Sequence, residues 1–98
     1  MPRSSIKEQE QIGRINKLQM SFAEVVRKLR QTKKISQEEF AERSGLHRTY
    51  ISDIERGVRN IAFSNIIRIC EALEISVSKL MQLVEREALE TDAAPSRR

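Results

Sequence analysis

Apolar residues recur at intervals of three and four along most of this chain, which is the spacing of one face of an α-helix. Gly45 and Gly57 fall where such patterns stop, and the two prolines lie at the chain ends. β-Branched residues show no period-two alternation that would predict a strand. The pattern therefore predicts an all-α protein. Its helices are expected at about 21–33, 36–44, 47–56, 64–74 and 77–87.

Serines mark the expected helix starts. Ser36 is followed three residues later by a glutamate, the capping-box spacing in which each side chain satisfies a backbone N–H at the start of a helix. Ser21 has the same spacing. We also expect Ser64 and Ser76 to cap the fourth and fifth helices, because serine is a favoured N-cap residue.

The segment before residue 21 has two interpretations. Ile15, Leu18 and Phe22 continue the three-and-four spacing backwards from the first helix, as in a coiled-coil seam. Gly13 would weaken a helix there by up to roughly 1 kcal/mol relative to alanine. The segment is therefore expected to be either a helix or a flexible arm.

Length and composition limit the class of protein. The 98 residues suit one small domain, which we divide into an N-terminal extension at 1–20, a functional domain at 21–87 and a flexible tail at 88–98. The sequence has no apolar run near the roughly 20 residues of a membrane span and no recognisable signal peptide. With Cys70 as its one cysteine, the chain is expected to act in a reducing cytoplasm.

The net charge of +4 is unevenly distributed. Residues 1–35 hold nine Lys/Arg against three Asp/Glu, whereas residues 36–56 hold three against five. A basic region favours contact with phosphate groups, but a solvated lysine-rich surface gives the same count. Charge alone leaves both interpretations open.

Residues 36–57, SQEEFAERSGLHRTYISDIERG, contain two short helix patterns joined by a turn. Gly45 suits the turn because glycine adopts the left-handed conformation without strain. Ile51 and Ile54 are expected to point inward from the second helix. Its other face carries Arg48, Thr49, Ser52 and Asp53. Short polar groups with one arginine suit the reading of base edges in a DNA major groove.

With these features, the chain resembles the phage-repressor and Cro-type helix-turn-helix family over about residues 21–84. The string HRTYISDIERGVRN, residues 47–60, resembles the controller proteins of bacterial restriction–modification systems. The resemblance implies a compact five-helix lambda-repressor-like domain. It also implies a sequence-specific transcriptional regulator that binds a palindromic operator as a homodimer. Such a regulator controls a linked gene and its own gene, and needs no cofactor.

The resemblance implies a role for each polar residue of the second helix. Arg48 would donate to guanine, and Thr49 would contact a base edge or a thymine methyl group. Ser52 lies on the same face. Asp53 would accept from cytosine or else pair locally with Arg48 or Arg56, and both alternatives stay open.

A second group is expected at the DNA backbone, where contacts set register and affinity without reading sequence. It comprises Gln37, Arg43, His47, Tyr50, Arg56, Arg59 and Asn60. His47 could instead cap its helix and Tyr50 could instead pack. For the arginines and Asn60 the alternative is a solvated surface position.

Two further sets concern architecture. Arg30 and Glu55 match family positions that form an internal salt bridge. A dimer is implied because one recognition helix reads too few base pairs to single out a site. Its expected interface is apolar and comprises Ile61, Phe63, Leu80, Met81 and Val84. Ordinary core packing is the alternative, and residues 12–18 could join the interface.

The expected partners are double-stranded DNA and a second copy of the chain, with RNA polymerase as a further candidate. The alternative function is an antitoxin or prophage-type repressor that also binds a protein partner. A module that binds only proteins is a third possibility. One histidine, one cysteine and no recognisable pair of carboxylates lead us to expect neither an enzyme nor a metal site.

Overall fold

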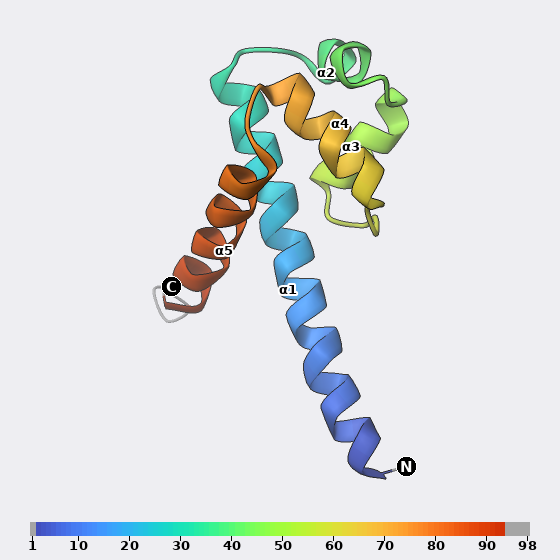
Figure 1. Cartoon of the computed structure of the whole chain (residues 1–98), viewed down its shortest axis with the longest axis vertical. Helices are drawn as coiled ribbons and strands as arrows, with labels where there is room; N and C mark the ends of the chain where they lie inside the picture. The colour runs from blue at the N-terminus through green and yellow to red at the C-terminus, as the bar shows by residue number, and fades with distance from the viewer. Residues whose placement is uncertain (1, 94–98) are drawn as a thin grey trace.

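The structure is a computed structural model that describes residues 2–93, with side chains described for residues 6–91. Within residues 2–93 the chain forms five helices (Figure 1). They are α1 (Pro2–Thr32), α2 (Gln37–Ser44), α3 (Arg48–Glu55), α4 (Phe63–Leu73) and α5 (Val77–Ala93). The predicted all-α architecture of five helices is confirmed.

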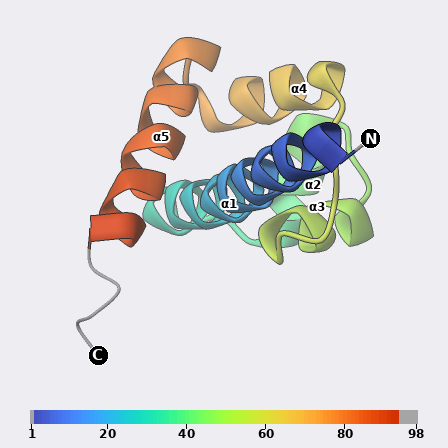
Figure 2. The ribbon, with the colours of Figure 1, turned by 90° about the horizontal axis from the view of Figure 1, so that it is seen from below.

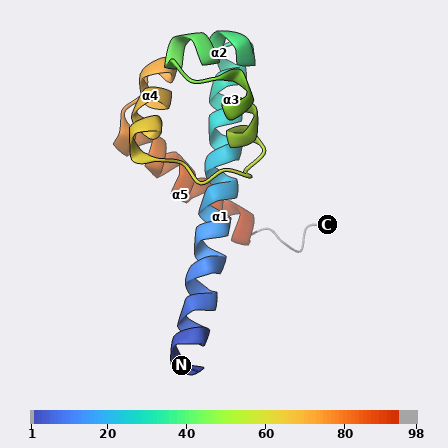
Figure 3. The same ribbon diagram turned by 90° about the vertical axis from the view of Figure 1, so that its right-hand side faces the viewer.

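The first helix is one continuous element that begins well before residue 21. The predicted cap at Ser21 is wrong, because this serine is buried in the middle of α1. Glu24 pairs instead with Arg27 at 2.6 Å and with Lys28 at 3.7 Å. The N-terminal half of α1 projects away from the rest of the molecule (Figures 1 and 3). We call residues 6–18 the arm.

The fifth helix packs along the C-terminal half of α1, on the side away from α2 and α3 (Figure 2). As predicted, Ser76 caps it, since Ser76 Oγ accepts from the N–H of Lys79 at 3.1 Å. The helix continues to Ala93 rather than ending near residue 87. Residues 88–93 are therefore helical and not part of a flexible tail, and the remainder of that predicted tail lies outside the described residues.

The fourth helix begins one residue earlier than expected. The predicted cap at Ser64 is wrong, because Ala62 occupies the N-cap position and makes no side-chain hydrogen bond there. The helix ends at Leu73, and its C-cap residue Glu74 has a left-handed φ of 58°. None of the helices within residues 2–93 combines the length and the apolar character needed to cross a membrane.

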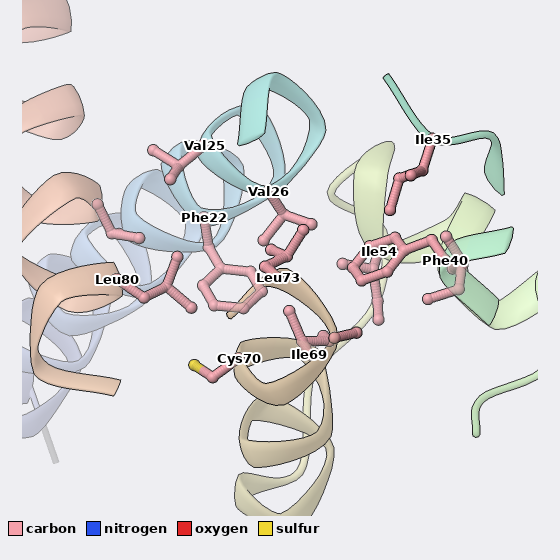
Figure 4. Packing of buried hydrophobic residues seen from close by; sticks show 13 residues of the cluster. Phe22, Val25, Val26, Ile35, Phe40, Ile54, Ile69, Cys70, Leu73 and Leu80 are labelled. Atoms are coloured by element: carbon pink, nitrogen blue, oxygen red, sulfur yellow. The ribbon is translucent and has the colours of Figure 1, made fainter. Parts of the chain in front are cut away.

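One hydrophobic core joins α1 to the other helices (Figure 4). Its largest fully buried side chains are Phe40, Ile51, Ile54, Ile69, Leu73, Leu80 and Val26. Leu80 is 0 % exposed and Val84 is 3 % exposed. The prediction that these two residues form a dimer interface is therefore wrong, because the packing of α5 on α1 buries them within one chain.

Candidate nucleic-acid interface

The turn between α2 and α3 is held by hydrogen bonds within its own residues. The N–H of Glu39 donates to Ser36 Oγ at 3.0 Å, so the predicted N-cap of α2 is confirmed. Gly45 has a φ of 77°, and its N–H donates to the Ala41 carbonyl at 2.9 Å. The next N–H, that of Leu46, donates to Ala41 O and to Ser44 Oγ. Gly45 thus takes the predicted left-handed conformation that reverses the chain.

Burial of one face of α3 determines which residues face outward. Ile51 and Ile54 are buried beside Phe40 of α2, as their spacing predicted. The opposite face is left to solvent, with Arg48 and Thr49 exposed and Ser52 half-buried. The residues proposed to read bases therefore share one accessible face of a short, anchored helix.

A buried ion pair ties the end of α3 to α1. Arg30 Nε lies 2.7 Å from Glu55 Oε2, and Arg30 Nη2 lies 3.0 Å from Oε1. Arg30 also donates to the Ile35 carbonyl, and Gln37 Nε2 donates to Glu55 Oε1 at 3.1 Å. The Glu55 side chain is only 3 % exposed. The ion pair expected from the family resemblance is thus present, and it joins α1, α2 and α3 at one point.

His47 caps α3. Its Nδ1 accepts from the N–H of Thr49 at 3.1 Å. The structure thus shows the capping alternative for His47. The cap satisfies one of the N–H groups that are unpaired at the start of a helix.

Arg48 makes a contact that the sequence analysis missed. Its Nε lies 3.0 Å from Glu38 Oε2, across the turn from α3 to the first residues of α2. Both side chains are exposed. Exposed ion pairs contribute at most about 1 kcal/mol, so a guanine edge can compete with Glu38 for this guanidinium.

Asp53 is engaged within the protein. Its Oδ1 accepts from Arg56 at 2.8 Å and its Oδ2 accepts from Arg59 at 3.0 Å, and the side chain is 18 % exposed. The Arg59 guanidinium also lies 4.9 Å from the centroid of the Tyr50 ring. The structure therefore shows the local-pair alternative for Asp53, with Arg59 in place of Arg48 as the second partner.

Tyr50 extends this cluster towards α4. Its hydroxyl accepts from Asn65 Nδ2 at 3.0 Å, and Asn65 Oδ1 accepts from Arg68 at 2.9 Å. The sequence analysis missed both Asn65 and Arg68. Tyr50 is half-buried, so it packs against the core in addition to this hydrogen bond. Asn60 is exposed in the loop between α3 and α4.

The two remaining residues that were predicted to contact the DNA backbone lie on α2. Arg43 is exposed and pairs with Glu39 of its own helix at 2.8 Å. Gln37 begins α2, but its side-chain amide is directed at Glu55. Gln37 thus contributes to the buried ion pair, and Arg43 is the α2 side chain available for a phosphate.

The basic N-terminal third is not gathered around α3. Carboxylates pair with several of its cations, including Arg27, Lys28, Arg30 and Lys33. The arm leaves the body at the end opposite α2 (Figure 3). This arrangement favours the solvated-surface interpretation of the positive charge. The cations beside α3 are instead Arg48, Arg56 and Arg59.

The other three residues of the expected dimer interface remain accessible to different degrees. Phe63 is 68 % exposed at the start of α4. Ile61 and Met81 are half-buried and line a groove of about 360 Å³, which Leu18 of the arm also lines.

Comparison with known proteins agrees with this geometry. A helix-turn-helix family model matches residues 26–80. The control protein C.SmaI of Serratia marcescens is 51 % identical over 60 residues, covering 61 % of this chain and 71 % of the relative. The control protein C.BamHI of Bacillus amyloliquefaciens is 45 % identical over 67 residues, covering 67 % of this chain and 83 % of the relative.

A solved structure extends the likeness to three dimensions. It is that of the restriction–modification controller protein C.Esp1396I, a tetramer in complex with its natural 35 base-pair operator. The two chains are 36 % identical with a TM-score of 0.70, over 74 % of this chain and 95 % of that one. Solved variants of the same protein alter each residue of a consecutive Arg-Thr-Tyr triplet, and the same three residue types stand in Arg48-Thr49-Tyr50.

These relatives are control proteins by name, in agreement with the prediction that the chain is not an enzyme. The family model covers more than half of the chain, from within α1 to the start of α5. The chain therefore belongs to the Cro-type helix-turn-helix family and, within it, to the controller proteins of restriction–modification systems.

Proposed function

We propose that this protein binds a palindromic DNA operator as a homodimer and regulates transcription of restriction–modification genes, its own included. The main support for this proposal is the polar, outward face of α3. Arg48, Thr49 and Ser52 lie together on a helix whose other face is buried, so their positions are set by the core rather than by flexible loops. A helix presented in this way fits the major groove.

Within this proposal the polar residues divide into two groups. Arg48, Thr49 and Ser52 read base edges. Arg56 and Arg59 contact the DNA backbone, where Asp53 holds both guanidinium groups in place through one oxygen each. Arg43 makes a second backbone contact from α2. Asp53 is thereby an anchor for two cations, since neither of its oxygens is without a donor in the protein.

The relatives support an operator and more than one copy of the chain. C.Esp1396I occupies its operator as a tetramer, and two-fold symmetry of a dimer matches a palindrome. We assign DNA binding and dimerisation to residues 21–87. A regulator of this kind acts in the bacterial cytoplasm, and contact with RNA polymerase would give it an activating role.

Selection of bound duplexes from a random pool, with the full chain as bait, tests the proposal. We expect an enriched palindrome whose half-sites are centred about 34 Å apart or a multiple of it, bound more tightly than about 100 nM at physiological salt. A chain with Arg48, Thr49 and Ser52 all changed to alanine is the control and should enrich no motif. Failure of the parent chain to enrich any duplex would overturn the proposal.

A further inference from the structure

We propose that the arm, residues 6–18 of α1, forms part of the contact between two copies of this chain. The inference rests on the proposed homodimer and adds to it a segment that lies outside residues 26–80, the part matched by the family model. The occupant of the arm's apolar face is a second copy of the same chain.

The first support is an apolar stripe on α1 that extends beyond the packed helices into the arm. Ile15, Leu18 and Phe22 follow one another at steps of three and four, so they lie on one side of α1. Phe22 is buried in the core. Ile15 is 55 % exposed and Ile12, beside it, is 53 % exposed. The side of α1 that faces the core therefore continues into the arm, where the described part of the chain does not cover it.

The second support is continuity with the accessible part of the expected dimer interface. Leu18 lines the groove of about 360 Å³ that Ile61 and Met81 also line. It lines a second groove, of about 410 Å³, whose far wall includes the exposed Leu89 of α5. Because Leu18 belongs to both grooves and to the arm stripe, one apolar strip runs from the α3–α4 loop to the arm.

The third support is that the arm lacks packing against the described body. Most helix stability in proteins comes from the packing of an apolar face rather than from propensity, and Gly13 in the middle of the arm lowers its helix propensity. Burial of aliphatic side chains against another molecule is the usual source of the missing stability. A symmetric second copy that covers Ile61 and Met81 would lie directly beside the stripe.

The test is the dimer dissociation constant of the full chain without DNA, measured by sedimentation equilibrium. The double variant Ile12→Gln/Ile15→Gln removes the stripe at two exposed positions, so the monomer fold is left intact. The matched control is Ile6→Gln, which is also exposed. Ile6 lies about two and a half turns from Ile15 and therefore on the opposite side of the helix. We expect the double variant to weaken the dimer at least about tenfold and the control to leave it unchanged.

Hydrogen exchange locates the effect. Amides of residues 6–18 should exchange more slowly above the dissociation constant than below it in the parent chain, and show no such difference in the double variant. A double variant that dimerises as tightly as the parent, or a control that weakens the dimer equally, would overturn the inference. So would a parent chain that stays monomeric at high concentration without DNA. The proposed function fails separately, since it is tested by enrichment of a DNA duplex.

Discussion

Arg30 of α1 and Glu55 of α3 face each other with two parallel hydrogen bonds of 2.7 and 3.0 Å. This bidentate geometry is the strongest that a guanidinium and a carboxylate form. Gln37 completes the shell of Glu55 from α2. The orientation of α3, and with it the face proposed to read DNA, therefore depends on a pair that is almost fully enclosed.

Glu55→Ala should lower the free energy of unfolding by about 3 kcal/mol or more, because it leaves the Arg30 charge without its partner in a mostly buried position. Urea unfolding followed by circular dichroism measures the change. The control is Arg30→Met/Glu55→Leu, which removes both charges and should recover most of the lost stability. A single variant that loses less than about 1 kcal/mol would show that the pair is not structurally important.

Arg48→Ala should relax base preference at one position of each half-site, at a cost of about 1–3 kcal/mol for the preferred base. Arg43→Ala should weaken binding to all sequences alike and reduce the salt dependence by about one counterion. Binding to a panel of single-substitution operators at two salt concentrations separates these effects. If the base preference of Arg48→Ala matches that of the parent, Arg48 does not read a base.

Asp53→Asn distinguishes two roles for Asp53, which either anchors Arg56 and Arg59 or contacts a base. Since Asp53 binds Arg56 and Arg59 in the structure, we expect the variant to keep the base preference of the parent. The freed cation should steepen the dependence of the binding constant on salt by about one counterion. Loss of discrimination at a single cytosine position would instead show that Asp53 contacts a base.

Gly45→Ala and Gly13→Ala should act in opposite directions. Gly45 has a φ of 77°, where an L-residue is strained, so the alanine should cost about 1–2 kcal/mol. Gly13 lies in open helix with no atom near an added Cβ, so the alanine there should stabilise α1 by up to about 1 kcal/mol. Thermal unfolding of each variant gives the sign. A neutral Gly45→Ala would contradict the importance of the left-handed turn.

The features that could be predicted from the sequence are those with a local cause. Ser36 lies three residues from the N–H that it caps, and Gly45 lies at the residue that must be left-handed. The three-residue spacing of Ile51 and Ile54 likewise places both side chains on one face of their helix, whatever the rest of the chain does. Cap, turn and buried face together are enough to identify the helix-turn-helix unit and the exposed residues of α3.

The errors arise where a local pattern is overruled by distant residues. Ser21 has the capping-box spacing, yet α1 runs through it and the packing of the other helices buries it. Leu80 and Val84 are apolar positions on α5, and nothing in their spacing says whether α1 or a second chain covers them. Pairs between elements, such as Arg48 with Glu38, have no fixed separation in sequence and so leave no pattern to detect.

The uninterrupted length of α1 has a geometric consequence. The N-terminal half of this helix is the arm. Near the C-terminal end of the same helix, Arg30 anchors α3 through its bond to Glu55. In a dimer joined through the arm, the distance and rotation between the two copies of α3 are set by a nearly rigid rod. One base pair added between half-sites turns one of them by about 34° about the DNA axis. Such a dimer would act as a ruler that rejects operators of the wrong spacing, whatever their half-site sequence.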